Sequence, residues 1–520
     1  MRSDNFNLQA GTFLIDRKYI FFLFLAFCIS LGFTITAWAG PKYGGKLRIL
    51  GEVDAMGFDV IKARSALGGG RAIGSLVMEK LFVRDKNDTI IPVLGTSAIS
   101  SEDGKTWTIK LRQGVRFHDG TPFNADAVVH HWQRLLDPKN RYRQRILFQP
   151  IIGVEKNDEY EVKFFLQHAW LPFMAVLTDP SGFTAMIPSP KAIDENTHNL
   201  APVGTGPFVF KEWRRGDRIA VTRNPNYWCK DRPYLDEVVY RAIPDHETRY
   251  ATLVSGQADI MITDRPAHVK KLSANPDFQK HIVHFRGAGI LALNTTRPPF
   301  DDVRVRRAIA HAWDQEKYIR ASYQDITPPT ENWFGNALDC NDSGYLRHDL
   351  AKARALMAEV GKPVEFEYVH TATNRGREAG IILQQMMKEV GIKVNPVPQD
   401  FPGIMKKLFS KNFDCTSWLI RGGYDMGPMT TAILHSKSPW NVTGYTNAEV
   451  DNLLIQQRLS MDPAIRAKTW CAIARKVNQD APFLYLFGRQ YYFFARNYVK
   501  NINPPSLGEE GTQFDFWLDK

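Results

Sequence analysis

The apolar and polar positions in the first half of the chain predict strands and a capped helix. Alternation and apolar runs predict strands at 44–50, 106–111 and 161–166. Apolar residues spaced four and three apart predict a helix that begins after Asn124 and ends at Asp137. An asparagine caps a first helical turn well, and the proline that follows Asp137 stops the helix.

The second half is richer in predicted helix. Asp301-Asp302, Asp349 and the pair Asp462-Pro463 are predicted to begin three helices. A fourth is predicted at about 377–390, with a strand at 392–394. Strands that alternate with helices favour an α/β fold. Because we find neither an internal repeat nor a low-complexity linker, we expect the domains to interleave along the chain.

Two glycine-rich segments are predicted to lie outside regular structure. Gly68-Gly69-Gly70 is predicted as a flexible loop, a hinge or a turn. Gly204-Thr205-Gly206-Pro207 is predicted to form a turn in which glycine adopts a positive φ. We assign neither segment a role in chemistry.

The first 39 residues have the pattern of a cleavable export signal. Two basic residues precede the apolar run 19–33, and Ala37-Trp38-Ala39 is typical of a cleavage site. The run is shorter than the ~20 residues that cross a bilayer, which argues against a membrane anchor. We therefore predict a signal peptide at 1–39 and a periplasmic mature protein.

Composition indicates a folded chain of several domains. The chain has 520 residues, of which 44% are hydrophobic and 12% aromatic, and this excludes a disordered protein. The net charge of +11 comes from scattered basic residues. Export argues against a nucleic-acid partner, so we interpret these charges mainly as solvated surface.

Cysteine and histidine spacing predicts no metal site. Four cysteines remain after cleavage, and in an oxidising compartment three pairings are open to Cys229, Cys340, Cys415 and Cys471. His130-His131 lies within the predicted helix, where neighbouring side chains point about 100° apart and do not chelate one metal in the usual way. We find no catalytic motif, so we predict a binding protein without cofactor or enzymatic activity.

Collinear motifs then identify a family. Residues 103–123, from Asp103-Gly104-Lys105-Thr106-Trp107 to His118-Asp119-Gly120-Thr121-Pro122-Phe123, resemble the signature of the family 5 extracellular solute-binding proteins. These are the dipeptide-, oligopeptide- and nickel-binding components of ABC importers. Further matches follow in the family's order at 171–173, 187–191, 202–208, 223–228, 243–245, 253–259, 294–295, 298–308, 444–445 and 449–451.

The resemblance implies a class II periplasmic binding protein fold, with two lobes joined by a hinge and an extra domain inserted in lobe one. The implied boundaries place lobe one at 41–85, 203–293 and 487–520, the extra domain at 86–202, and lobe two at 294–486. The hinge strands would cross near 290–293 and 485–488. A ligand bound between the lobes would stabilise a closed form.

The implied function is capture of peptides or peptide-like solutes and their delivery to an inner-membrane ABC permease, by a monomer. Two alternatives remain at this point. One is a secreted hydrolase with an unrecognised site. The other is a nickel or haem carrier of the same fold that uses His130, His131 or His168.

The residues implied to bind the ligand depart from the family pattern. Peptide-binding relatives hold the ligand's amino group with a carboxylate shortly after a tryptophan in lobe two. Trp418 matches the tryptophan, but Arg421 occupies the carboxylate position and the nearest acid is Asp425. Three interpretations stay open: Arg421 binds an anion, Asp425 binds an amine, or both face solvent or each other.

Further candidates lie close to these positions in the chain. Arg375 stands just before a predicted helix, where it would add to a helix N-terminus that attracts anions. Aromatic and amide side chains near the expected cleft are typical of small-ligand sites. These are Tyr424, Trp440, Asn441 and Tyr445.

Overall fold

The computed structural model describes residues 40–63, 68–85, 87–179, 184–335, 338–502 and 515–520. The chain divides into two compact units, 1–42 and 43–520. In the first unit only 40–42 are described, and they have no regular secondary structure. The predicted signal peptide at 1–39 lies outside the described residues. In the part of the chain that is described, no helix is long and apolar enough to cross a membrane.

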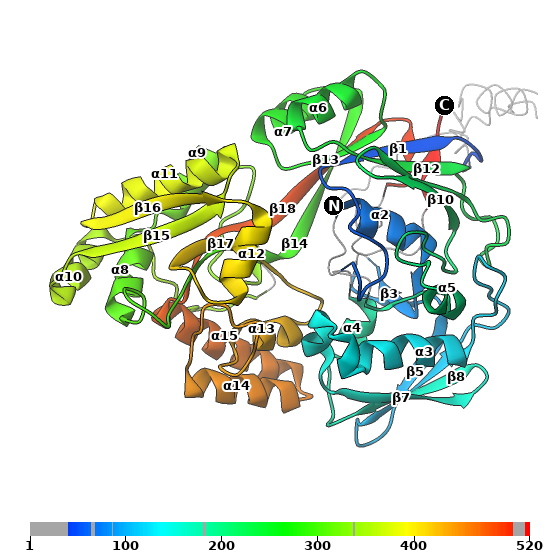
Figure 1. Ribbon diagram of the computed structural model, residues 1–520, viewed down its shortest axis with the longest axis horizontal. Coiled ribbons are helices and arrows are strands. Elements are labelled where there is room, and N and C mark those ends of the chain that lie inside the picture. The colour runs from blue at the N-terminus through cyan, green and yellow to red at the C-terminus, as the bar shows by residue number, and fades with distance from the viewer. Residues whose placement is uncertain (1–39, 64–67, 86, 180–183, 336–337, 503–514) are drawn as a thin grey trace, which may run out of the picture. The chain divides into compact units, whose positions relative to one another are not determined.

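The second unit is a mixed α/β structure, as predicted (Figure 1). Its α-helices are α2 (Gly68–Val77), α3 (Ala125–Leu136), α4 (Phe173–Thr178), α5 (Pro190–Asp194), α6 (His246–Val254), α7 (Pro266–Ser273), α8 (Val303–Ala312), α9 (Gln315–Tyr323), α10 (Leu350–Val360), α11 (Asn374–Lys388), α12 (Phe401–Phe409), α13 (Met426–Leu434), α14 (Ala448–Leu459) and α15 (Pro463–Asp480).

A ten-stranded sheet forms the largest framework, in the order β10-β11-β12-β1-β13-β18-β14-β17-β15-β16. Its strands are β1 (Lys46–Gly51), β10 (Phe208–Arg214), β11 (Arg218–Arg223), β12 (Glu237–Ala242), β13 (Ile260–Thr263), β14 (Phe278–Leu293), β15 (Val364–Thr371), β16 (Ile392–Gln399), β17 (Cys415–Arg421) and β18 (Phe483–Arg496).

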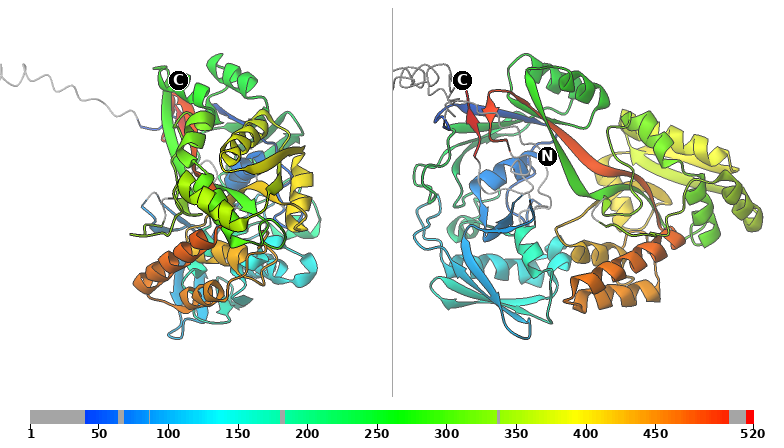
Figure 2. Two further views of the ribbon diagram at one scale, coloured as in Figure 1. Left: turned by 90° about the vertical axis from the view of Figure 1, so that its left-hand side faces the viewer. Right: turned by 180° about the vertical axis from the view of Figure 1, so that it is seen from behind.

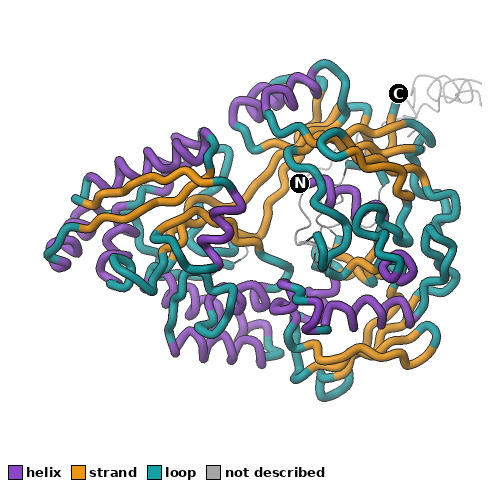
Figure 3. The backbone as a smooth tube through the Cα atoms, viewed as in Figure 1, coloured by secondary structure: helices purple, strands orange, loops and turns teal. Residues whose placement is uncertain are grey.

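Two long antiparallel strands connect the halves of this sheet. β14 and β18 pair along most of their length, with β-bulges between His284 and Ala288 and between Gly289 and Ile290. Figure 2 shows β14 in green and β18 in orange-red running side by side. β18 also pairs with β13, and β14 pairs with β17. On the β17 side the sheet continues as parallel strands β15 and β16, and α11 packs along them (Figure 3). Any ligand site beside β14 and β18 therefore lies where the halves meet.

A separate four-stranded sheet has the order β5-β6-β8-β7, from strands β5 (Gly95–Ser100), β6 (Thr106–Leu111), β7 (Ile151–Asp158) and β8 (Glu161–Leu166). Helix α3 packs against β7 and β8 around Trp132, which is fully buried. Short two-stranded pairs complete the described strands: β2 (Glu79–Lys80) with β9 (Met186–Ile187), β3 (Phe82–Arg84) with β4 (Ile90–Pro92), and β19 (Val499–Lys500) with β20 (Trp517–Leu518).

Buried apolar side chains gather in several clusters. One lies within 81–187, two lie within 288–486, and two combine residues from 47–283 with residues from 492–518. These groupings follow the interleaved order expected from the sequence. The individual domain boundaries stay a prediction.

The predicted helix starts are confirmed at α3, α8, α10 and α15. The side chains of Asn124, Asp302, Asp349 and Asp462 each accept a hydrogen bond from a backbone N–H in the first turn. Helix α11 begins slightly earlier than predicted, after Thr373, which caps it. Capping succeeds as a predictor because it depends on residues within one turn of the chain.

Both glycine-rich segments differ from prediction. Gly68-Gly69-Gly70 is the first turn of α2, and a Cβ at Gly69 would come within 2.7 Å of the Tyr240 ring. Gly206 has no positive φ; a Cβ there would come within 2.5 Å of the backbone oxygen of Leu76. Close approach, and not a left-handed conformation, therefore requires glycine at Gly69 and Gly206, whereas Gly68 has a positive φ of +51°.

The structure pairs two of the four cysteines. A disulfide joins Cys340 to Cys471, while Cys229 and Cys415 are free thiols. His131 is buried and bonds the backbone oxygen of Thr184, whereas the neighbouring His130 pairs with Asp194. Among the residues that the structure describes, no group of three or more His, Cys, Asp or Glu side chains is placed to hold a metal ion.

Candidate functional site

The main cavity, of about 680 Å³, lies beside the β14, β17 and β18 strands. Its wall is completed by residues near the end of β13 and by helices α9, α11 and α12. A cavity of this size and with several aromatic side chains is typical of small-ligand sites. The aromatic residues that line it are Tyr318, Tyr323, Tyr368, Phe401, Phe409, Trp418, Trp440, Phe483, Phe487, Tyr491 and Tyr492.

Glycine in β14 makes room for an aromatic side chain of the cavity wall. Gly289 pairs with Leu419 on one side and with Phe487 on the other, so the three residues share a face of the sheet. A Cβ at Gly289 would come within 2.7 Å of the Phe487 ring, which lies over it. The Phe487 ring continues the wall towards Tyr323, with 4.7 Å between ring centroids.

Trp418, in β17, lies on the wall of the cavity. It pairs with Ile290 of β14 and is half-buried. Its indole packs edge-on against Phe409, and Phe409 in turn contacts Trp440, with centroids 5.9 and 6.5 Å apart. These three rings form one aromatic wall of the cavity.

Arg375 also lines the cavity, but its surroundings differ from the prediction. It is the second residue of α11 and donates to Asp264, with 2.6 Å between Nη1 and Oδ2. Its guanidinium also lies 4.8 Å from the centre of the Tyr323 ring. Burial alone would lower the pKa of Arg375, but Asp264 raises it above its ordinary value. The arginine is thus already engaged by a carboxylate.

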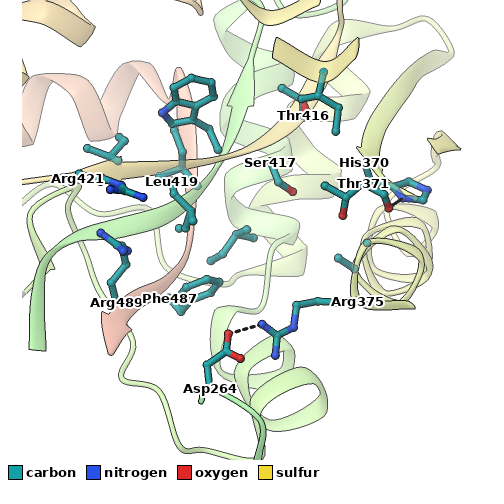
Figure 4. A pocket seen from close by; sticks show the side chains of 18 of the residues that line it. Asp264, His370, Thr371, Arg375, Thr416, Ser417, Leu419, Arg421, Phe487 and Arg489 are labelled. Carbon is teal, nitrogen blue, oxygen red and sulfur yellow. Dashed lines mark hydrogen bonds and ion pairs between the residues drawn. The ribbon is translucent and has the colours of Figure 1, made fainter. Parts of the chain in front are cut away.

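Arg421 and Arg489 lie at another part of the cavity. Arg421 is the last residue of β17, opposite Gly287, and Arg489 belongs to β18. Figure 4 shows their guanidinium groups pointing towards one another, away from the Asp264–Arg375 pair. Two planar cations in this arrangement can accept a carboxylate or phosphate between them.

Asp425 has a structural partner within the protein. Its carboxylate caps α13 by accepting from the Gly427 N–H at 2.7 Å, and it accepts from Arg466 at 2.8 Å. The Arg466 side chain is only 6% exposed, so this is a largely buried pair. Asp425 lines a small second cavity of about 30 Å³ and not the main one. Its geometry does not favour capture of an amine in the main cavity.

Tyr424 also lies at the small cavity, between two arginines. The Arg84 and Arg286 guanidinium carbons are 4.8 and 5.4 Å from the centre of its ring. Arg286 further donates to the Tyr424 backbone oxygen at 2.8 Å and pairs with Asp88 at 2.6 Å. Tyr424 thereby joins the segment after β17 to β3 and to the loop that follows β3.

Asn441 and Tyr445 line neither of the two cavities described here. Both are buried, and the Asn441 side chain donates to the Tyr445 backbone oxygen at 2.7 Å. The Tyr445 hydroxyl donates to Asp480 at 2.7 Å. These polar groups satisfy one another within the fold, so we do not carry them into the proposed site.

Several cavity residues were not identified from the sequence. Among them are Asp264, Tyr323, His370, Thr371, Phe487 and Arg489. A signal was available for the last two, because Phe487 lies within the segment 485–488, where a hinge strand was predicted, and Arg489 directly follows it. The others come from strands and helices distant in sequence, which no local pattern brings together.

Comparison with known proteins gives a consistent result. The glutathione-binding protein GsiB of Pectobacterium atrosepticum is 28% identical over 479 residues, 88% of this chain and 91% of the relative. A dipeptide-binding protein from Pseudoalteromonas sp. SM9913, solved with Met-Leu, has a TM-score of 0.81 at 22% identity. The superposition covers 91% of this chain and 100% of that protein. AgaA from A. tumefaciens R10, solved with agropinic acid, has a TM-score of 0.79 at 25% identity, over 92% of this chain and 99% of AgaA.

The strongest assignment comes from the family comparison. Residues 89–441 match the bacterial extracellular solute-binding proteins, family 5 Middle, and this segment is more than half of the chain. The fold of this chain, built on the ten-stranded sheet, is similar to that of the solved structures. The chain belongs to the family 5 bacterial extracellular solute-binding proteins.

Proposed function

We propose that this protein is the substrate-binding component of an ABC importer and that it captures peptides or peptide-like solutes in the main cavity. The observation that carries the proposal is the 680 Å³ aromatic cavity beside the strands that connect the halves of the sheet, in a chain of this family. Similar proteins bind glutathione and Met-Leu, which belong to the same solute class.

The position of the cavity suggests how binding is signalled. Its lining combines residues after β13 with residues from α11, α12 and β17, so one ligand contacts both sides of the β14–β18 connection. A ligand that contacts both sides stabilises the arrangement in which they lie close together. The permease would then recognise this closed arrangement and receive the solute unchanged. The proposal includes the division of the chain into lobe one, the extra domain and lobe two.

Four of the residues expected from the sequence remain in the proposed site: Arg375, Trp418, Arg421 and Trp440. In this proposal Trp418 and Trp440 supply apolar contact area, Arg421 contacts an anionic group, and Arg375 orders the wall through Asp264. Export by the signal at 1–39, action as a monomer in the periplasm, and delivery to an inner-membrane permease complete the proposal.

A binding panel tests this function. We expect at least one of glutathione, Met-Leu and agropinic acid to raise the Tm of the purified mature protein, because a ligand that binds only the folded state stabilises it. At a concentration one hundred times its Kd the ligand adds about 2.7 kcal/mol to the free energy of unfolding. Titration calorimetry then gives the Kd.

The same samples separate binding from turnover. Mass spectrometry of the denatured complex should recover the bound solute intact. Recovery of cleaved solute would indicate a hydrolase. A protein whose Tm and heat of titration respond to none of the three solutes would contradict the proposed function.

A further inference from the structure

The main cavity carries an excess of positive charge. Four arginines line it, Arg265, Arg375, Arg421 and Arg489, while Glu52 and Asp264 are the acids among its described lining residues. With His370 neutral, the lining has a formal charge of +2. In a partly enclosed site this charge favours an anionic guest, since water screens it less than it screens surface charges.

Both acids are already engaged by arginines. Asp264 accepts from Arg375 at 2.6 Å, and Glu52 lies 3.7 Å from Arg249, with more than half of its side chain exposed. A ligand's ammonium group could pair with either carboxylate only if that carboxylate left its arginine. One ion pair would then replace another. The lining therefore gives an ammonium group little to gain.

The Arg421–Arg489 pair lies at the point where β14 carries no side chain. Arg421 is opposite Gly287 on one side of β14. On the other side Gly488 is opposite Ala288, and Arg489 follows it at the β-bulge. The two guanidinium groups thus extend from the two strands that flank β14, and Figure 4 shows them facing each other.

Gly287 is required for this arrangement by its backbone. Its φ is +144°, and a Cβ there would come within 2.3 Å of the Ile420 backbone oxygen. A side chain at this position would displace the end of β17 and with it Arg421. The close placement of the two arginines therefore depends on a conformation that glycine alone adopts readily.

An anion that lies between the two guanidinium groups is attracted by both. A carboxylate offers two oxygens that match the planar fork of each arginine. Arg489 is only 7% exposed, so its bond to a bound anion would be shielded from water.

We propose that Arg421 and Arg489 together hold a carboxylate of the transported solute, and that recognition depends on this anionic group and not on a free amine. The inference rests on the proposed function and narrows its substrate class to anionic peptide-like solutes, with N-blocked compounds included. Arg489 thereby becomes a specificity-determining residue.

Matched derivatives of one ligand test the inference. The probes are Met-Leu, N-acetyl-Met-Leu and Met-Leu amide, together with glutathione, N-acetylglutathione and glutathione diethyl ester, titrated by calorimetry. Loss of the amine should change the Kd by less than about threefold. Loss of the carboxylates should weaken binding at least tenfold, because the charge-assisted bonds between the ligand and both arginines are then lost.

Variants assign the effect to the two arginines. Arg421→Gln and Arg489→Gln should each weaken the free acid at least tenfold and the amide or ester by less than threefold. Arg421→Lys keeps the positive charge but loses the planar guanidinium group. Its Kd for the free acid should therefore lie between the values of the wild type and of Arg421→Gln. Arg214→Gln on β10, at the far edge of the sheet, removes the same charge from an exposed position and should leave every Kd unchanged. Should Arg489→Gln not fold, the derivatives still decide the question in the wild type.

Two results are distinguishable. If Met-Leu or glutathione binds, but the amide or ester binds equally well or N-acetylation abolishes binding, this inference is overturned and the proposed function stands. If the parents and all their derivatives fail to bind, and agropinic acid fails too, the proposed function is overturned and the inference falls with it.

Discussion

Glu79 on β2 is a buried carboxylate held by three donors. It accepts hydrogen bonds from the Thr205 hydroxyl, the Tyr227 hydroxyl and the Trp228 indole N–H, at 2.7–2.9 Å. Burial raises the pKa of Glu79 from 4.5 to about 7, although the three donors oppose the rise. The folded protein therefore binds this proton more tightly than the unfolded chain does.

The stability of the protein should depend on pH through Glu79. Because its pKa is higher in the folded state, its stabilising contribution is present below pH 4.5 and is lost as the pH rises through about 7. We expect the wild type to lose about 2–3 kcal/mol more unfolding free energy than Glu79→Gln between pH 5 and 8. Urea denaturation at both pH values measures this difference.

An exposed glutamate provides the control for this prediction. Glu102→Gln changes the same side-chain chemistry in a surface turn and should follow the wild-type pH dependence. If Glu79→Gln and Glu102→Gln show the same pH dependence, Glu79 does not carry the effect.

Residue roles were predictable where they depend on neighbours in the chain. The N-caps at Asn124, Asp302 and Asp349 follow from side chains that bond the next helical turn. The partners of Asp425 and Arg375 could not be predicted in this way, because Arg466 and Asp264 lie 41 and 111 positions away. Only the fold brings these charges together.

Among the elements, β14 combines length with two glycines at its centre. Gly287 carries a positive φ at the end of its pairing with β17, and Gly289 lies under the Phe487 ring. Flanking β-bulges interrupt the regular pairing with β18 at the same place. Bulges and glycines of this kind are common beside functional sites.

Substitution of Gly287 should lower the stability of the protein by more than the positive φ of this residue alone would imply. We expect Gly287→Ala to lower the free energy of unfolding by about 1–3 kcal/mol and to weaken solute binding, because the new Cβ meets the Ile420 oxygen and displaces Arg421. Chemical denaturation and titration of Met-Leu measure the two effects.

A second glycine separates backbone strain from this contact. Gly391 has a positive φ of +77° and open space around its Cβ position, so Gly391→Ala should cost only about 1 kcal/mol and leave binding intact. Equal effects of the two substitutions on stability and binding would show that the contact with Ile420 is unimportant.

Elements with a strong local pattern were the ones that sequence identified. Helices α3, α8, α10 and α15 combine caps with apolar spacing, and β6 alternates cleanly. The full extents of β14 and β18 were not predicted, because a strand inside a large sheet is defined by partners far away in the chain. Most residues of the cavity wall were not predicted for the same reason, because they come together from distant parts of the chain.

For the second unit as a whole, the Asp264–Arg375 ion pair joins distant segments across the cavity. Asp264 directly follows β13, whereas Arg375 belongs to α11 on the other side of the β14–β18 connection. Each side chain is about one quarter exposed, so water screens the pair only in part. The pair therefore favours the arrangement that encloses a solute.

Removing this ion pair should weaken capture. We expect Asp264→Asn and Arg375→Gln each to raise the Kd of the best-bound panel solute by about five- to thirtyfold, since the closed arrangement loses about 1–2 kcal/mol. The double variant should be no weaker than the weaker of the two single variants. Calorimetric titration of all four proteins completes the cycle, and simply additive losses would mean that the two groups act separately.

The glycine-and-bulge segment of β14 and β18 has a consequence for release. Arg421 and Arg489 extend from the strands on either side of this segment, so a bend there would alter the spacing of their guanidinium groups. Binding of the solute and bending of the connecting strands would then involve the same segment. If the permease separates the two sides of the cavity, the same movement would weaken the contacts of the two arginines with the solute. No second conformational change elsewhere in the cavity would be needed for release.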